Sequence, residues 1–232
     1  VVYYFTSASA LGAPDRNVSF TVPTGNFGDI YAGEIARRMG LPIERLVVAT
    51  NQNDILHRAL SQGEYRVGEV MPSVSPSMDI QVSSNFERLL FDAYDRDGAA
   101  IAQLMDELKN GGFSISQGVR EGLAEGFGSD RVSEEETLAR ITTTLHDSAE
   151  LLCPHSAVGV EVAMRQPRST TPMVTLATAH PAKFPDAVER ASGIRPPLPK
   201  RMADLYDRSE RVTQVANDLG AIQALIQEKR RA

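Results

Sequence analysis

The residues of this chain whose types and spacing most clearly indicate chemistry are Pro23-Thr24-Gly25-Asn26-Phe27-Gly28-Asp29. They follow a short alternating apolar run at 18–22 and precede a run at 30–39 with apolar residues at helical spacing. A strand that turns through a glycine-rich loop into a helix directs several backbone N–H groups at one point, together with the positive end of the helix dipole. Such a point binds phosphate without lysine or arginine. The loop therefore favours a phosphorylated ligand.

The glycine spacing by itself leaves a second interpretation open. Gly25-x-x-Gly28 matches neither the dinucleotide fingerprint nor the P-loop. The alternative is a tight strand-to-helix turn in which Asn26 or Asp29 caps the following helix. A carboxylate at Asp29 also repels a phosphate unless its side chain points away. The rest of the chain has to decide between these two interpretations.

Polar residues also follow two other predicted strands. Thr178 closes a strand-like run at 172–178, where α/β sheets place their ligands, although a β-branched strand residue is the simpler interpretation. Asn51 and Asn53 follow the strand-like run at 45–50 in the same way. For Asn53, a helix cap is the simpler account.

Other chemistry-bearing groups favour structural roles. Ser83-Ser84-Asn85 and Arg88 could contact an anion, but a capped helix with a solvated arginine is favoured. Cys153 beside His155 could be a nucleophile, yet an inert buried cysteine is the simpler interpretation. No metal site is predicted, because none of the histidines has a His or Cys partner at ligand spacing. The histidines are His57, His146, His155 and His180.

The elements that must position these groups alternate along the chain. Strand-like and helix-like segments in alternation predict an α/β fold with three layers, in which helices cover both faces of a parallel sheet. Residues 1–195 are predicted to form most of this α/β domain. Residues 196–232 are predicted to form a proline-rich tether and an amphipathic helix from about residue 210.

Composition narrows the classes of protein. With 232 residues and 42% hydrophobic side chains, the chain can bury a substantial core. A net charge of −6 argues against nucleic-acid and acidic-membrane partners, and no apolar run is long enough to cross a bilayer. The single cysteine favours a reducing, cytoplasmic environment. The chain opens within an apolar, helix-like run, so we expect an N-terminal part to be missing.

Five distinctive segments span nearly the whole chain: Pro23-Thr24-Gly25-Asn26-Phe27-Gly28-Asp29, Ala49-Thr50-Asn51-Gln52-Asn53-Asp54, Ser75-Pro76-Ser77-Met78-Asp79, Pro154-His155-Ser156-Ala157-Val158-Gly159 and Thr178-Ala179-His180-Pro181-Ala182-Lys183-Phe184. In type and order they resemble the C-terminal half of threonine synthase, a pyridoxal-phosphate (PLP) enzyme. The resemblance is strongest to the bacterial and fungal branch. It implies the large domain of a fold type II PLP enzyme, similar to the tryptophan synthase β subunit.

The resemblance also implies roles for particular residues. The cup for the cofactor phosphate would consist of Gly25, Asn26, Phe27, Gly28 and Asp29. The hydroxyl of Thr178 would contact the pyridine nitrogen. The implied reaction converts O-phospho-L-homoserine and water to L-threonine and phosphate, which makes the family carbon–oxygen lyases acting on phosphates.

One departure from the family pattern limits this expectation. The family's Schiff-base lysine lies in a Phe-Lys-Asp motif, and none of the lysines has that setting. They are Lys109, Lys183, Lys200 and Lys229. We therefore expect the lysine to belong to a missing N-terminal half, and this chain alone to be inactive. Two alternatives remain open: a PLP-dependent phospho-lyase for other O-phospho amino acids, and a non-catalytic phosphate- or nucleotide-binding module.

Overall fold

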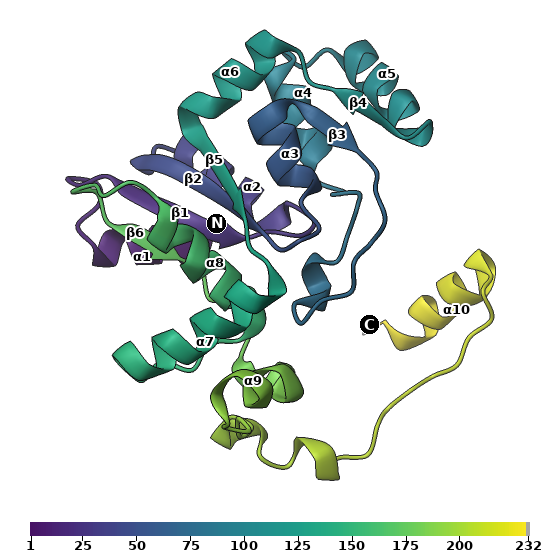
Figure 1. Ribbon diagram of the computed structural model, residues 1–232. Helices are drawn as coiled ribbons and strands as arrows, with labels where there is room; N and C mark the ends of the chain where they lie inside the picture. Colours follow the sequence, from purple (N-terminus) through teal and green to yellow (C-terminus); the bar gives the residue numbers. More distant parts are fainter. Residues whose placement is uncertain (231–232) are drawn as a thin grey trace. The chain divides into compact units, whose positions relative to one another are not determined.

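A four-stranded parallel sheet forms the centre of the computed structural model, which describes residues 1–230 (Figure 1). The strand order is β5-β2-β1-β6. All neighbouring strands in the sheet run parallel. The strands are β1 (Val18–Pro23), β2 (Ile43–Thr50), β5 (Phe127–Arg131) and β6 (Met173–Thr175). The predicted α/β fold with a parallel sheet is confirmed.

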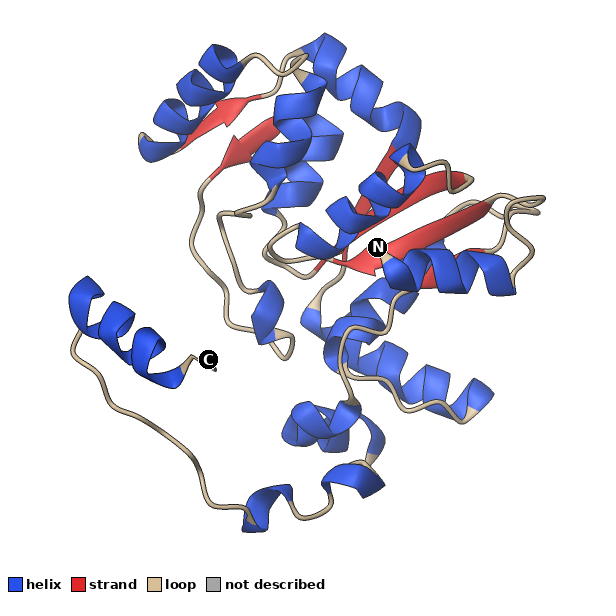
Figure 2. Cartoon of the chain, turned by 180° about the vertical axis from the view of Figure 1, so that it is seen from behind, coloured by secondary structure: helices blue, strands red, loops and turns tan. Residues whose placement is uncertain are grey.

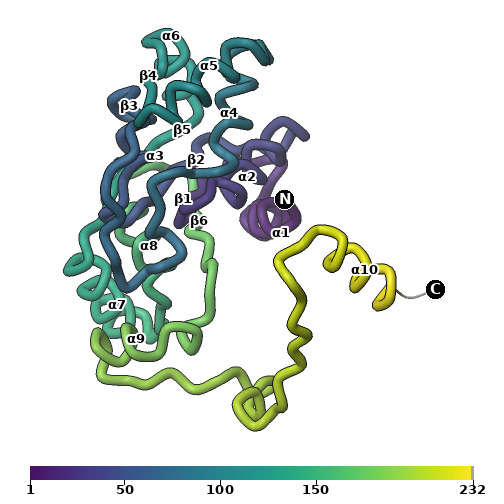
Figure 3. The backbone as a smooth tube through the Cα atoms, turned by 90° about the vertical axis from the view of Figure 1, so that its right-hand side faces the viewer, coloured from purple at the N-terminus to yellow at the C-terminus, as the bar shows by residue number. Residues whose placement is uncertain are grey.

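Helices cover both faces of this sheet (Figure 2). The helices of the α/β part of the chain are α1 (Val2–Ala10), α2 (Gly28–Arg38), α3 (Ile55–Gln62), α4 (Phe86–Ala93), α5 (Gly98–Lys109), α6 (Gln117–Gly126), α7 (Glu134–Ser148), α8 (Pro154–Arg165) and α9 (Pro185–Ser192). A small antiparallel pair, β3 (Glu64–Arg66) and β4 (Gly112–Ser114), lies with α4, α5 and α6 at one end, as the backbone trace shows (Figure 3).

The alternation of side chains along the strands separates two cores. Val22 and Val48 belong to one core, together with residues of α1 and α2. Val47, one position away, belongs to a second core with Val158 and Val162 of α8. Because successive strand residues point to opposite faces, β1 and β2 are buried on both sides. This gives the three layers.

The predicted elements differ from the structure in two places. The run at 172–178 forms only a three-residue strand, Met173–Thr175, so Thr178 lies three positions beyond its end. The helix expected from about residue 210 is shorter and begins later, as α10 (Leu219–Lys229). The last two residues of that prediction, 231 and 232, lie outside the described part of the chain.

Contacts within the chain divide it into two units, Val1–Pro197 and Leu198–Ala232. The sequence places the boundary two residues earlier, after 195. The second unit contains α10 and two 3₁₀ turns, η3 (Lys200–Met202) and η4 (Leu205–Asp207), and none of these elements has a buried residue. None of the described helices is long and apolar enough to span a membrane.

Candidate functional site

The loop between β1 and α2 lies at the carboxyl end of the two central strands. β1 ends at Pro23, and the N–H of Thr24 still donates to the carbonyl of Ala49 on β2 at 2.8 Å. The chain then turns through Gly25 and Asn26. Ligands of open α/β sheets bind beyond this edge. The structure therefore places the predicted phosphate loop where such a fold can use it.

The loop presents a row of backbone donors. Phe27 occupies the N-cap position of α2 with φ of 66°, in the left-handed region, and no side chain caps the helix. The alternative in which Asn26 or Asp29 caps this helix is therefore wrong. Within residues 1–230, the N–H groups of Asn26, Phe27, Gly28 and Asp29 have no protein acceptor. Consecutive unsatisfied N–H groups at a helix N-terminus form an anion site.

The carbonyl groups of the loop are held on the opposite side. The hydroxyl of Ser83 donates to the carbonyl of Gly25 at 2.8 Å. Asn85 donates to the carbonyl of Asn26 twice, from its side-chain amide at 2.8 Å and from its backbone at 3.1 Å. The C=O and N–H of a trans peptide point in opposite directions, so the N–H groups of Asn26 and Phe27 face away from these partners. Asn85 occupies the N-cap position of α4, as the favoured capped-helix interpretation expects, but no side chain donates or accepts a capping hydrogen bond there.

Only one of the two loop glycines is required for close packing. A Cβ on Gly25 would lie 2.6 Å from the carbonyl oxygen of Ser77, a distance that side-chain carbons do not reach. A Cβ on Gly28 would meet only the amide of Asn85, at 3.5 Å. Ser77 belongs to the short 3₁₀ helix η1 (Pro76–Met78). Gly25 is therefore needed for its approach to η1.

Asp29 interacts with the first helix. The hydroxyl of Tyr4 on α1 donates to the backbone carbonyl of Asp29 at 3.0 Å. The same hydroxyl lies 3.5 Å from Oδ1 of the Asp29 carboxylate. Burial raises the pKa of the Asp29 carboxyl, and it raises the pKa of Tyr4 more strongly. The carboxylate is thus engaged with α1, which favours accommodation of an anion at the loop.

A polar network fills the space beyond the end of β2. Asn51 and Asn53 are both about 3% exposed, and the side-chain amides of both donate to the carboxylate of Asp79, at 2.7 and 3.0 Å. Asn53 also pairs with the backbone of Met71 in both directions. Helix α3 has Asp54, not Asn53, at its N-cap position and no side-chain cap. The simpler account of Asn53 as a cap is therefore wrong.

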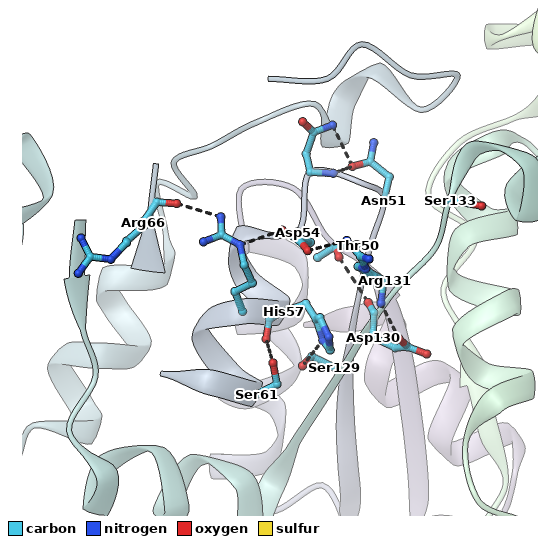
Figure 4. A network of polar contacts seen from close by, with 12 residues as sticks. Thr50, Asn51, Asp54, His57, Ser61, Arg66, Ser129, Asp130, Arg131 and Ser133 are labelled. Carbon is cyan, nitrogen blue, oxygen red and sulfur yellow. Dashed lines mark hydrogen bonds and ion pairs between the residues drawn. The ribbon is translucent and has the colours of Figure 1, made fainter. Parts of the chain in front are cut away.

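Next to this network, polar contacts join the start of α3 with β5 (Figure 4). Nδ1 of His57 lies 3.0 Å from the hydroxyl of Ser129. The carboxylate of Asp54 pairs with Arg58 at 2.9 Å and with Arg131 at 3.1 Å. These contacts fasten the edge strand to the helix that follows β2.

His155 connects η1 with the segment that contains Thr178. Its Nε2 accepts a hydrogen bond from the N–H of Ser77 at 3.2 Å, and its ring lies 4.5 Å from the ring of Phe184. Burial lowers the pKa of His155 to about 4, and the positive charge of Lys183 adds to the effect. The imidazole is therefore neutral at pH 7. The sequence places His155 beside Cys153 and within the family segment at 154–159. Its links to Ser77 and Phe184 cannot be predicted from local pattern.

The structure places Thr178 in an irregular, exposed segment between β6 and the 3₁₀ turn η2 (Pro181–Lys183). Its predicted contact with a cofactor ring stays a prediction.

Cys153 is 1% exposed, and its Sγ lies 3.2 Å from the hydroxyl of Ser156. A buried thiol with this neighbour fits the inert interpretation. Residues 1–230 contain no cluster of three metal-ligating side chains.

Comparisons with known proteins agree on one family. The family model described as "Threonine synthase, C-terminal" matches residues 156–226. The chain is 52% identical to threonine synthase of Pseudomonas aeruginosa over 98% of its own length and 49% of that protein.

Solved structures give the same result. The crystal structure of PLP-bound threonine synthase from Brucella melitensis superposes with a TM-score of 0.92 at 54% identity, over 100% of this chain and 50% of that one. Threonine synthase from yeast superposes with a TM-score of 0.82 at 38% identity, over 97% and 50%. The chain is therefore a homologue of threonine synthases, as the sequence segments predict, and it spans about half the length of the relatives that it matches.

Proposed function

We propose that this chain forms the cofactor-phosphate cup and the ring partner of a threonine synthase. The whole enzyme would be a cytoplasmic PLP-dependent lyase that converts O-phospho-L-homoserine and water to L-threonine and phosphate. The observation that carries the proposal is the row of backbone N–H groups from Asn26 to Asp29 that have no protein acceptor within residues 1–230. The 54% identity to a protein solved with PLP supports the choice of phosphorylated ligand.

The donor set fits the phosphate of PLP. Main-chain N–H groups and the N-terminus of α2 attract a dianion without a basic side chain. The loop carbonyls are held by Ser83 and Asn85, so they do not oppose the anion. This arrangement supports the roles that the family resemblance implies for Gly25, Asn26, Phe27, Gly28 and Asp29. When bound, PLP supplies an electron sink for carbanion chemistry at the amino acid substrate.

Thr178 would orient the cofactor ring. A neutral hydroxyl that contacts the pyridine nitrogen does not enforce the positive charge that a carboxylate partner enforces, so it tempers electron withdrawal by the ring. The location of Thr178 between β6 and η2, at the carboxyl end of the strands, supports this role. The segment is connected with η1 through Phe184 and His155.

The group that moves protons is proposed to lie outside these residues. The Phe-Lys-Asp motif that the family resemblance requires does not occur among them. The chain spans about half of its relatives. We infer that an N-terminal half supplies the lysine and completes the substrate site, and that residues 1–232 alone are inactive.

The test compares the complete gene product with residues 1–232. With PLP, the complete product should show a visible absorption band that borohydride abolishes, and it should release phosphate from O-phospho-L-homoserine. Residues 1–232 should do neither. Phosphate release that is faster from O-phosphoserine would instead favour a different phospho-lyase. A complete product without the band would favour a non-catalytic phosphate-binding module.

A further inference from the structure

The segment at 71–79 contains no helix or strand before η1. It nevertheless lies directly against Gly25 of the proposed phosphate loop. The carbonyl of Ser77 occupies the space that a Cβ on Gly25 would need, at 2.6 Å. The carbonyl of Ser77 therefore lies close against Gly25, at the start of the loop whose N–H groups form the proposed cup. We call residues 71–79 the brace segment.

One carboxylate holds the brace segment together. Oδ1 of Asp79 accepts hydrogen bonds from the hydroxyl of Ser73 at 2.6 Å, the amide of Asn51 at 2.7 Å and the amide of Asn53 at 3.0 Å. Its Oδ2 accepts from the backbone N–H of Ser73 at 2.8 Å. Four donors thus converge on a single anionic group. Hydrogen bonds to an ionised acceptor are about twice as strong as neutral ones.

The donors connect the brace segment with the end of β2. Asn51 directly follows Thr50, the last residue of that strand. Asn53 reaches the start of the segment, since its amide donates to the carbonyl of Met71 at 2.9 Å and its Oδ1 accepts from the N–H of Met71 at 2.8 Å. Asp79 therefore fastens the far end of the segment to Asn51 and to Asn53, and Asn53 also holds its beginning.

A second contact links η1 with helix α8, whose residues Val158 and Val162 share a core with Met78. The N–H of Ser77 donates to Nε2 of His155 on α8 at 3.2 Å. One backbone group of Ser77 is thus directed to α8, while its carbonyl is directed to Gly25. Ser77 therefore lies between α8 and the loop.

We propose that Asp79 is a positioning residue for the phosphate cup. Its carboxylate sets the brace segment, and the carbonyl of Ser77 transmits that position to the backbone of Gly25. The inference rests on the proposed function, because it specifies which group shapes the phosphate site. Loss of the Asp79 charge should disorder the cup although no donor to the phosphate is removed.

The test is Asp79→Asn in the complete gene product. The amide keeps the shape of the side chain, but its NH₂ group must face one of the four donors. We expect the affinity for PLP to fall roughly tenfold or more, and the affinity for pyridoxal, which lacks the phosphate, to stay unchanged. The matched control is Asp106→Asn, because the Asp106 carboxylate is exposed on α5 and, among residues 1–230, pairs only with Lys109.

A measurement without cofactor separates this inference from the proposed function. In the apo protein, hydrogen–deuterium exchange in Asp79→Asn should accelerate at 24–30 and 71–79 and stay unchanged in β2 and α8. Ser73→Ala removes one donor and should give the same pattern more weakly, which tests the inference even if Asp79→Asn fails to fold.

Two outcomes would overturn the role of Asp79. The first is an equal loss of affinity for PLP and pyridoxal, which indicates general destabilisation. The second is unchanged exchange at 24–30. Failure of the wild-type protein to bind PLP would instead reject the proposed function, and the exchange result would still decide whether Asp79 sets the loop.

Discussion

The ring of His155 lies 4.5 Å from the ring of Phe184, with 42° between their planes. This contact joins the helix that follows Cys153 to the segment that carries Thr178. The same imidazole accepts a hydrogen bond from the backbone of Ser77. One neutral side chain thus connects two segments of the candidate site, and its titration affects both.

The pH dependence of stability should reveal this histidine. The folded pKa of about 4 lies below the ordinary value of 6.5, so the unfolded chain binds the proton more tightly. Stability from this group is complete above pH 6.5 and is lost as the pH falls towards 4, by about 3 kcal/mol in total. Thermal unfolding between pH 7 and 4 should show a steeper loss for wild type than for His155→Gln, whose side chain can still accept from Ser77.

The matched control for that measurement is His146→Gln, because His146 is exposed near the end of α7 beside Asp147. Its pH profile should follow wild type. Parallel profiles for wild type and His155→Gln would contradict the assignment of the buried, neutral imidazole.

Gly25→Ala should weaken cofactor binding. The new methyl group would collide with the carbonyl of Ser77. Overpacking of this kind costs about 1–3 kcal/mol, which corresponds to roughly a tenfold to hundredfold loss in PLP affinity. Titration with PLP of the complete gene product, prepared without cofactor, measures this loss of affinity. Gly118→Ala is the control, since a Cβ there meets nothing within 4 Å. Equal PLP affinity in the two variants would show that the approach of Ser77 is unimportant.

Thr178→Val should lower turnover while the cofactor stays bound. The substitution removes the hydroxyl and keeps the branched shape. Loss of one donor that acts in the transition state costs about a hundredfold in kcat. The measurement is kcat per bound PLP, with Thr178→Ser as the variant that restores the hydroxyl. Full turnover in Thr178→Val would reject the proposed contact with the ring.

Cys153→Ala should retain turnover. The thiol is buried and accepts the N–H of Ser156 at the start of α8 at 3.4 Å, so its loss removes a helix cap and costs about 1 kcal/mol of stability. The kcat of the variant and its thermal midpoint together measure this prediction. A variant that folds but releases no phosphate would make Cys153 a nucleophile.

The sequence predicts the parts of the fold in which local pattern and final environment agree. The apolar runs at 18–22 and 45–50 become central strands because both of their faces are buried. β5 was missed, since its residues are Phe-Gly-Ser-Asp-Arg and only Phe127 is fully buried. An edge strand next to ion-paired side chains has no apolar run to reveal it.

Local pattern fails where a partner comes from a distant segment. Asn53, Ser83 and Asn85 have the residue types of helix caps, yet their acceptors are backbone carbonyls of other loops. Such pairings depend on which distant segments come together in the fold. The propensities of neighbouring residues carry no information about this. The row of N–H groups at 26–29 could be predicted, because these donors belong to the main chain of the loop itself.

Because the proposed donors belong to the main chain, substitutions in the loop can change side chains without removing a donor. Every residue other than proline carries an N–H, so replacement of Asn26 alters a side chain but leaves the donor in place. In the proposed site, recognition of the phosphate depends on torsion angles, notably the positive φ of Phe27. Under the proposed function, mutations that abolish phosphate binding should therefore concentrate at Gly25 and at the residues that fix those angles, while the side chain of Asn26 is free to vary.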